Sequence, residues 1–283
     1  MSNFVLDKNS PIILVDGSYF IFHRFFATLK WYKFKNKEMD DSSCMKNEEF
    51  CNAIKKHAIA DLEKLRKKWA TVHTGKKRLS KKDWENIPVW FAMDCCRGDI
   101  WRSSLVTDYK GTRDIGRSFD SSCFEILYEV IRKEVPVFEG SKLEADDIIA
   151  LTHKRLRMIG YNGLIVCVTN DNDYLQLRDE NTQLYNLDGK DIGLRSCGDP
   201  KKDLLLKILL GDKSDNISPV RKKLNEKKLK ELIHLTEEEI INSLCLNEDE
   251  VEEMKHNRKL IDFSYIPMDL EEAYNSTYDI EMK

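Results

Sequence analysis

Acidic residues near position 144 have the types and the spacing that metal-dependent chemistry requires. Residues 143–151 read as the first turns of a helix, on which Glu144 and Asp147 share a face with Ile148 and Leu151. A carboxylate that points toward an apolar core is unfavourable unless a cation compensates it. Two interpretations stay open here, because acidic residues also simply favour helix N-termini.

Three apolar runs elsewhere in the chain lead into further aspartates. Runs without alternation are typical of strands buried on both faces of a parallel sheet, and such sheets bind ligands outside the carboxyl ends of their strands. The runs are residues 12–15 before Asp16, 89–93 before Asp94, and 164–168 before Asp171 and Asp173. We therefore expect these aspartates to meet the acidic helix start at one edge of a sheet.

Carboxylates gathered in this way would repel one another unless divalent cations neutralised them. Oxygen ligands favour Mg²⁺ or Mn²⁺ over zinc, and the scattered histidines and cysteines give no competing site. The predicted metal ligands at the sheet are Asp16, Asp94, Glu144, Asp146, Asp147, Asp171 and Asp173. Asp212 and Asp215, at a turn that follows an apolar helix, add two more.

Composition limits the classes of protein to consider. The chain has 283 residues, 41% of them hydrophobic and 34% charged, which is ordinary for a globular protein of one domain or slightly more. No apolar run approaches the roughly 20 residues of a membrane span, and the N-terminus lacks a signal-peptide pattern. The eight cysteines form no C-x-x-C pair, which indicates reduced thiols in a cytoplasm.

The net charge of −3 conceals strong segregation of charge along the chain. Residues 55–82 hold eleven Lys and Arg against two Asp and Glu, and residues 221–230 hold six against one. Basic segments beside a carboxylate cluster would suit a phosphate backbone held over metal ions. Each run could equally be a solvated helix face.

Alternating strands and helices up to about residue 200 predict an α/β fold built of βαβ units. A helix is expected over 45–69, a polar loop over 71–83, a helix over 124–133, a short strand at 135–137 and another strand at 184–187. Ser141 and Glu144 form a candidate capping box for the acidic helix, and Gly160 is its expected stop. From 203 onward we expect only helices, at 204–210, 224–233, 237–244 and 248–261, followed by a polar tail.

Residues 97–124 interleave basic and aromatic side chains with weak periodicity. Such a composition can hold single-stranded nucleic acid, with cations on phosphates and rings stacked on bases, although a basic loop without function remains an alternative. The candidate nucleic-acid-binding residues in this segment are Arg97, Arg102, Tyr109, Lys110, Arg113 and Arg117.

Five motifs in this order resemble those of the 5′ nuclease family, which includes flap endonucleases, the 5′→3′ exonuclease domain of bacterial DNA polymerase I and phage 5′ nucleases. They are Asp16-Gly17-Ser18, Tyr109-Lys110-Gly111-Thr112-Arg113, Glu144-Ala145-Asp146-Asp147, Thr169-Asn170-Asp171-Asn172-Asp173 and Gly211-Asp212-Lys213-Ser214-Asp215-Asn216. Within the family, the ribonucleases H of T-even phages look most similar, in the 211–216 turn and in residues 260–267.

The resemblance implies a PIN-like α/β catalytic domain over 1–200, with a helical arch at about 97–124, and a helical C-terminal subdomain over 201–283. It implies two Mg²⁺ ions, which Mn²⁺ would replace. The first metal would be held by Asp16, Asp94, Glu144 and Asp146 and the second by Asp173, Asp212 and Asp215, with Asp171 between the metals and Asp147 lining the site. Lys110, Arg113 and Asp171 would be the catalytic residues.

The implied activity is hydrolysis of phosphodiesters near 5′ ends of DNA and of RNA paired with DNA, as in removal of primers and flaps during replication. The implied partners are these substrates, a single-strand binding protein and a sliding clamp, and the chain would act as a monomer. Two alternatives stay open: a PIN-type ribonuclease on single-stranded RNA, and a non-catalytic nucleic-acid-binding scaffold.

The sequence departs from the family after Asn216, where most relatives carry a glycine-rich hairpin that grips duplex phosphate. Residues 217–223 contain no glycine. Lys222 and Lys223, together with Lys227 and Lys228, are predicted to replace that grip by charge.

Overall fold

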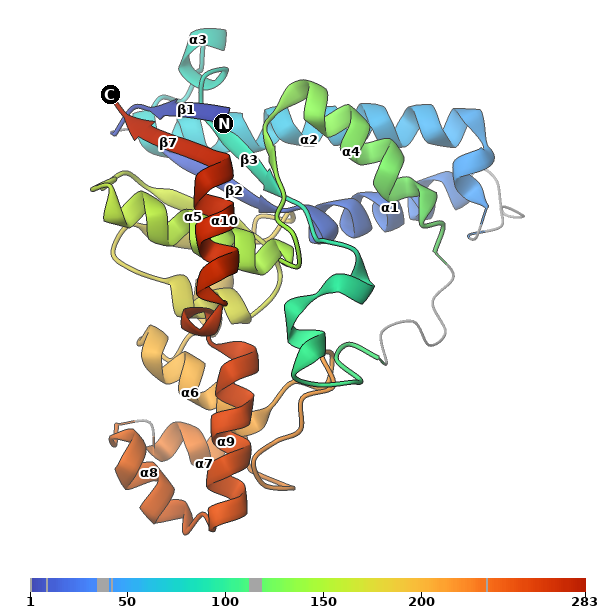
Figure 1. Ribbon diagram of the computed structural model, residues 1–283. Helices are drawn as coiled ribbons and strands as arrows, with labels where there is room; N and C mark the ends of the chain where they lie inside the picture. The colour runs from blue at the N-terminus through green and yellow to red at the C-terminus, as the bar shows by residue number, and fades with distance from the viewer. Residues whose placement is uncertain (1, 9, 35–40, 42, 112–118, 233) are drawn as a thin grey trace.

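A five-stranded parallel sheet, in the order β4-β3-β2-β5-β6, forms the centre of the protein (Figure 1). The computed structural model describes residues 2–283 except 9, 35–40, 42, 112–118 and 233, and it leaves the side chains of 2, 3, 226, 228 and 230 undescribed. The strands are β2 Ile12–Asp16, β3 Val89–Ala92, β4 Val137–Phe138, β5 Ile165–Val168 and β6 Thr182–Tyr185. Because every pair is parallel, all carboxyl ends lie at one edge, which confirms the predicted α/β sheet.

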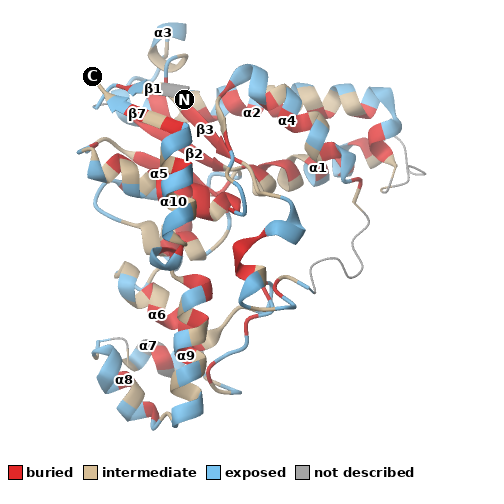
Figure 2. Ribbon diagram, in the orientation of Figure 1, coloured by how far each residue is buried: buried red, intermediate tan, exposed pale blue. Residues whose placement is uncertain are grey.

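Both faces of the sheet are covered, which explains why the strands read as unbroken apolar runs. Along β2, Ile13 and Val15 enter one core while Ile12 and Leu14 enter the other. All four side chains are at most 2% exposed, and each such burial contributes on the order of 1.5–3 kcal/mol. Figure 2 shows this buried centre between exposed helix faces.

One face packs against three helices, α1 Gly17–Lys33, α2 Glu48–Thr74 and α4 Ser122–Glu134. A helix lies where one was expected over 45–69, but it begins at Glu48 and continues to Thr74, and Gly75 caps it in a left-handed conformation. The predicted loop over 71–83 is therefore wrong at both ends. At its far end Ser80 and Asp83 form a capping box that starts α3, Lys81–Trp84.

The other face packs against α5, Ala145–Met158. The expected capping box at Ser141 is wrong, because Glu144 is the N-cap and Asp147 closes the box three residues later. Gly160, with φ of 83°, follows the C-cap Ile159 as predicted. Glu144, Asp147, Ile148 and Leu151 are all buried, as their shared face predicts.

Four helices pack around a core of their own beyond the sheet. They are α6 Pro200–Leu210, α7 Glu226–Leu232, α8 Glu237–Leu244 and α9 Glu248–Ile261, and the predicted bounds of α8 and α9 are confirmed. In Figure 1 this group lies below the sheet, and α9 leads from it back toward α10.

The expected polar tail is wrong, because the chain ends in helix α10, Met268–Thr277, and strand β7, Tyr278–Met282. β7 pairs in parallel with β1, Ser2–Leu6, so the two terminal strands lie side by side, with the two chain ends at opposite ends of the pair (Figure 1). Tyr278 and Ile280 alternate with polar residues and are buried in the same core as α5. The last residues thus pack with the sheet and not with the helical group.

Among the helices of the described residues, none has both the length and the apolar character that crossing a membrane requires.

Candidate metal centre

Two aspartates mark the carboxyl ends of neighbouring strands. Asp16 is the last residue of β2 and the N-cap of α1, where its carboxylate accepts from the Tyr19 amide at 2.9 Å. Asp94 follows β3 and accepts from the Ala145 amide at 2.8 Å and from the Ser18 hydroxyl. These contacts tie the ends of two strands to the first turn of α5.

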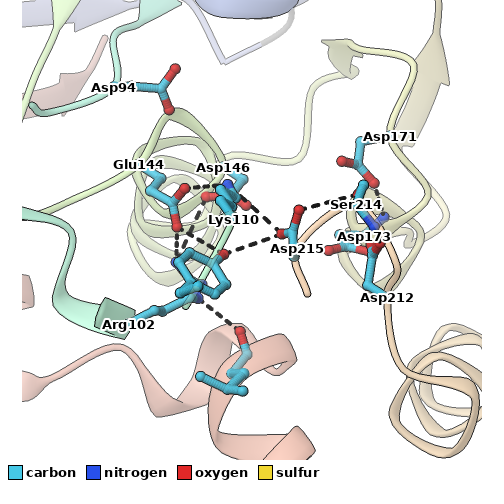
Figure 3. Close-up of polar contacts among 12 residues, drawn as sticks. Asp94, Arg102, Lys110, Glu144, Asp146, Asp171, Asp173, Asp212, Ser214 and Asp215 are labelled. Atoms are coloured by element: carbon cyan, nitrogen blue, oxygen red, sulfur yellow. Dashed lines mark hydrogen bonds and ion pairs between the residues drawn. The ribbon is translucent and has the colours of Figure 1, made fainter. Parts of the chain in front are cut away.

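The start of α5 carries a first group of carboxylates. One oxygen each of Glu144, Asp146 and Asp147 lie within 4.8 Å of one another, a spacing that can surround a metal ion. Figure 3 shows Glu144 and Asp146 on the same side of the site as Asp94. The side chain of Asp146 is 20% exposed whereas that of Asp147 is 0% exposed, so only Asp146 of this pair faces solvent.

Arg102 is buried beneath this group, and its side chain is 2% exposed. Its guanidinium donates to Asp147 at 2.7 and 2.9 Å, to Glu144 at 2.9 Å and, from Nε, to the Leu260 carbonyl at 2.7 Å. The prediction that Arg102 binds nucleic acid is wrong, because its side chain is buried and its guanidinium already donates to three residues of the protein.

Asp147 is predicted to line the site as a metal ligand, and one of its oxygens belongs to the first carboxylate group. Its two oxygens accept from Arg102, from the Trp101 indole at 2.9 Å and from the Glu144 amide at 3.1 Å. Three of these four contacts are to Oδ2 and one, from Arg102, is to Oδ1, and the role of Asp147 as a ligand stays a prediction. Asp147 therefore supports the site from below by holding Arg102 and the backbone of Glu144.

Tyr109 and Lys110 join the first group to the turn after α6. The Tyr109 hydroxyl lies 3.0 Å from Glu144 and 3.2 Å from Asp215, and the ring is buried, so this residue supports carboxylates and does not offer a face for base stacking. The Lys110 ammonium contacts Glu144 and lies 3.8 Å from Asp215. The Lys110 amide donates to the Asp215 carbonyl at 3.0 Å, which fixes the two segments together.

A second group of carboxylates comprises Asp173, Asp212 and Asp215, again with one oxygen each within 4.8 Å. Asp212 and Asp215 lie on a tight turn after Gly211, whose φ of 65° suits glycine. A Cβ at Gly211 would lie 2.5 Å from the carbonyl oxygens of Ile217 and Ser218. Glycine therefore allows the chain to fold back and place both aspartates.

Asp215, a member of the second group, is linked to Glu144 of the first group through Tyr109 and Lys110. It lies between Glu144 and Asp173 in Figure 3, and its carboxylate receives the Tyr109 hydroxyl on one side and the Ser214 hydroxyl, at 3.1 Å, on the other. Asp171 lies beside Asp173, whose amide donates to it at 3.0 Å. The bridging position that the resemblance gives to Asp171 stays a prediction: its charge interacts with Asp16 and Asp146 as well as with Asp173.

Burial and mutual repulsion raise the pKa of the site carboxyls. Burial, then the charge of Asp94, raises the pKa of Asp16 to about 7. Burial, then Asp146, raises the pKa of Glu144 to about 7, and burial, then Asp171, raises the pKa of Asp173 to about 8. Without a bound cation these groups would hold protons near neutral pH, which is the behaviour expected of a site built for metal.

The other predicted nucleic-acid residues are placed differently. Arg97 is exposed and donates to the Lys110 carbonyl. Lys222 and Lys223 are exposed in the segment that follows Asn216. The side-chain amide of the buried Asn257 donates to the Ser218 carbonyl at 2.8 Å and so anchors this segment. Arg113 and Arg117 lie outside the described residues.

The sequence reasoning missed one charged member of the site, Lys207. Its ammonium lies 2.7 Å from Asp173 and contacts Asp212. The sequence did hold a signal for this residue: Lys207 is the only charged side chain in the apolar run 204–210, and it lies five residues before Asp212. Tyr174, whose hydroxyl lies 3.1 Å from Asp16, was also missed, and its ring gave no signal beyond core packing.

Comparisons with known proteins agree with this arrangement. A family model described as "5'-3' exonuclease, N-terminal resolvase-like domain" matches residues 11–199. Ribonuclease H of Enterobacteria phage T4 is 28% identical over 198 residues, which cover 62% of this chain and 64% of that protein. DNA polymerase I of Streptococcus pneumoniae is 31% identical over 137 residues, 43% of this chain and 15% of the polymerase. The chain thus matches less than two thirds of the length of either relative.

Solved structures share the fold over nearly the whole chain. The metal-bound phage T5 D15 protein has a TM-score of 0.63 at 17% identity, with 94% of this chain and 97% of that one covered. A T5 D15 flap endonuclease complex with DNA and metal ions has a TM-score of 0.62 at 15% identity, with the same coverage. At this level of identity the likeness supports the fold.

Proposed function

Because this chain belongs to the 5′-3′ exonuclease family, we propose that it is a metal-dependent 5′ nuclease. It would hydrolyse phosphodiesters near the 5′ ends or flaps of DNA and of RNA–DNA hybrids, as in the removal of primers during replication. The named relatives and the T5 D15 complex with DNA support this substrate class. A monomer that works in the cytoplasm, beside a single-strand binding protein and a sliding clamp, would suit this role.

The observation that carries the proposal is the convergence of carboxylates from three separate segments into two groups (Figure 3). Two further strand ends add to them: Asp94 is tied to the start of α5 by the Ala145 amide, and the charges of Asp94, Asp146 and Asp171 act on Asp16. The donors are all carboxylate oxygens, a set that suits Mg²⁺, with Mn²⁺ as a substitute. Asp16, Asp94, Glu144 and Asp146 would hold one ion, and Asp171, Asp173, Asp212 and Asp215 the other.

When bound, two divalent ions would supply the positive charge that stabilises the attacking and leaving oxygens of an in-line displacement. The chain itself would contribute position and further charge. Lys110, already fixed between Glu144 and Asp215, would direct its ammonium at the phosphate, and Arg113 would assist. Asp147 and Arg102 would keep Glu144 in place, so that substrate binding does not have to order it.

Replacing Asp171 with Asn tests the assignment of the metal centre. The change removes one charged ligand with little change in volume, and we expect turnover to fall roughly 100-fold or more. Binding of a 5′-flap substrate, measured by fluorescence anisotropy in Ca²⁺, should stay within about threefold of wild type, because phosphate contacts lie elsewhere. Cleavage at the wild-type rate by Asp171→Asn would refute the metal-centre assignment.

A Mg²⁺ titration with labelled 5′-flap, nicked, RNA-primed and single-stranded RNA substrates separates the alternatives. A 5′ nuclease cuts the first three near their 5′ ends in proportion to bound Mg²⁺. A PIN-type ribonuclease would cut the single-stranded RNA in preference, and a scaffold would bind without cutting. The two complete carboxylate groups favour the first outcome, since a scaffold has no use for them.

A further inference from the structure

Lys207 lies within the second carboxylate group, where a cation of the chain takes oxygens that a metal would need. Its ammonium is 2.7 Å from Asp173 Oδ1 and also contacts Asp212 Oδ2. These are two of the three residues whose oxygens converge closely enough to hold an ion. The Lys207 side chain is 21% exposed and those of Asp173 and Asp212 are 11% and 12% exposed, so water screens this contact poorly.

We propose that Lys207 is an exchangeable counter-ion of the second carboxylate group. Its ammonium holds Asp173 and Asp212 together in the absence of metal and must release them when a divalent ion binds. The inference rests on the proposed function, because it takes this group to be a metal site. Lys207 would act through Asp173 and Asp212, whose oxygens it positions, and would thereby set the affinity of the second group for its metal ion.

Distances show why the ammonium and a metal ion compete. Mg²⁺ binds carboxylate oxygens at about 2.0–2.1 Å and requires nearly regular octahedral geometry. An ion on Asp173 Oδ1 and Asp212 Oδ2 would occupy the same lone pairs that Lys207 uses now. It would also lie within about 4 Å of the ammonium, where like charges repel strongly in a partly buried site. Metal and ammonium therefore cannot both keep these contacts.

The position of Lys207 allows it to withdraw without unfolding the site. It lies in the last turn of α6, whose apolar residues Leu206, Ile208 and Leu209 are buried in the helical core. A lysine stem has four rotatable carbons, so the ammonium can swing away while the helix stays packed. Asp212 keeps its contacts with the Ser214 amide and hydroxyl, at 2.6 and 2.7 Å, and so remains oriented for the incoming ion.

The exchange predicts that Lys207 lowers the metal affinity of the second group, because binding there costs the contacts that its ammonium must give up. The Lys110 ammonium makes a similar contact with Glu144 in the first group, so replacement of Lys207 tests the second group alone. Removing the Lys207 ammonium should therefore tighten metal binding at the second group, which is opposite to the effect of deleting a residue that helps to bind metal.

The test is a Mn²⁺ titration without nucleic acid, with free Mn²⁺ measured by electron paramagnetic resonance. We expect wild type to bind two ions, and Lys207→Met to bind one of the two about tenfold more tightly or better. Lys207→Arg, which keeps the charge, should not gain affinity. Lys133→Met is the matched control, since that exposed lysine lies at the end of α4, away from the carboxyl edge of the sheet.

Thermal unfolding provides a second readout that does not depend on activity. In EDTA the Lys207→Met protein should melt below wild type, and saturating Mn²⁺ should raise its midpoint by more than it raises that of wild type. If Lys207→Met is too unstable in EDTA, Lys207→Gln, which can still donate hydrogen bonds, takes its place in both measurements.

Unchanged or weakened Mn²⁺ binding by Lys207→Met and Lys207→Gln, with two ions bound to wild type, would overturn the role of Lys207 and leave the proposed nuclease intact. Failure of wild type to bind any divalent ion would overturn both. The two failures are therefore distinguishable in one experiment.

Discussion

At the scale of single residues, the side chains that hold the site carboxylates in place have contacts as well defined as those of the carboxylates. Arg102 compensates Glu144 and Asp147 from the buried side, while the Lys110 ammonium contacts the other oxygen of Glu144. Its pKa is raised well above its usual value: burial opposes its charge, but Asp147, Asp146 and Glu144 outweigh that effect. The guanidinium thus stays charged at any pH at which the protein folds.

Replacing Arg102 with Met should cost about 3–5 kcal/mol of unfolding free energy, because it leaves two buried carboxylates without their partner. Urea denaturation in EDTA, monitored by tryptophan fluorescence, measures the change. Arg132→Met is the control, since Arg132 pairs with Glu139 on the surface and its loss should cost at most about 1 kcal/mol. A cost for Arg102→Met no larger than that of the control would show that Arg102 is not a structural support.

The carboxylates could be predicted from the sequence, but their supports could not. Asp16, Asp94 and Asp171 follow apolar runs, and the parallel-sheet rule alone brings such positions together. Arg102 and Tyr109 lie in a segment of weak periodicity, where their basic and aromatic character suggested contact with nucleic acid. Arg102 contacts the Leu260 carbonyl, more than 150 residues later, and the Tyr109 hydroxyl contacts Asp215, more than 100 residues later, and no local pattern encodes such contacts.

At the scale of elements, burial explains which predictions held. β2, β3 and β5 are buried on both faces, and α8 and α9 begin at strong capping boxes, so local signals sufficed. The pair β1 and β7 was missed because each strand is stabilised only by a partner from the other end of the chain. The predicted strand at 184–187 was placed two residues late for a related reason, since register with β5 sets β6 at Thr182–Tyr185.

The segment after Asn216 and helix α7 present lysines where the family carries a glycine-rich hairpin. Lys222, Lys223 and Lys227 are exposed, and the buried Asn257 anchors the segment to α6 through the Ile208 carbonyl at 3.0 Å. A rigid base under exposed cations favours contact with a phosphate backbone.

A triple variant, with Glu at Lys222, Lys223 and Lys227, should bind a nicked duplex more weakly. The slope of log K against log salt should also flatten, by about 0.9 for each phosphate that the protein no longer neutralises. Fluorescence anisotropy over a range of KCl concentrations measures both quantities. Lys133→Glu, which changes charge far from this segment, should leave the slope unchanged, and an unchanged slope in the triple variant would exclude the lysines from the interface.

At the scale of the whole molecule, the two carboxylate groups lie where the sheet, residues 97–111 and the helical group meet, so their charge affects global stability. Asp16 and Glu144 have a pKa of about 7 and Asp173 of about 8 in the metal-free fold, against 3.8 for an aspartate and 4.5 for a glutamate in the unfolded chain. Because the folded values are higher, the folded state binds more protons than the unfolded state between about pH 4 and pH 8.

It follows that the stability of the metal-free protein should fall as pH rises through this window and level off above about pH 8. Saturating Mg²⁺ should remove the fall, because it binds the deprotonated carboxylates and releases their protons. Differential scanning calorimetry in EDTA and in Mg²⁺, at steps from about pH 5 to about pH 8.5, measures both curves. Asp173→Asn is the informative variant: it deletes the group with the highest of these pKa values, so its EDTA curve should be flatter than that of wild type. A midpoint in EDTA that rises steadily across this range would mean that these carboxyls ionise freely in the fold, and that no cation is needed to hold them together.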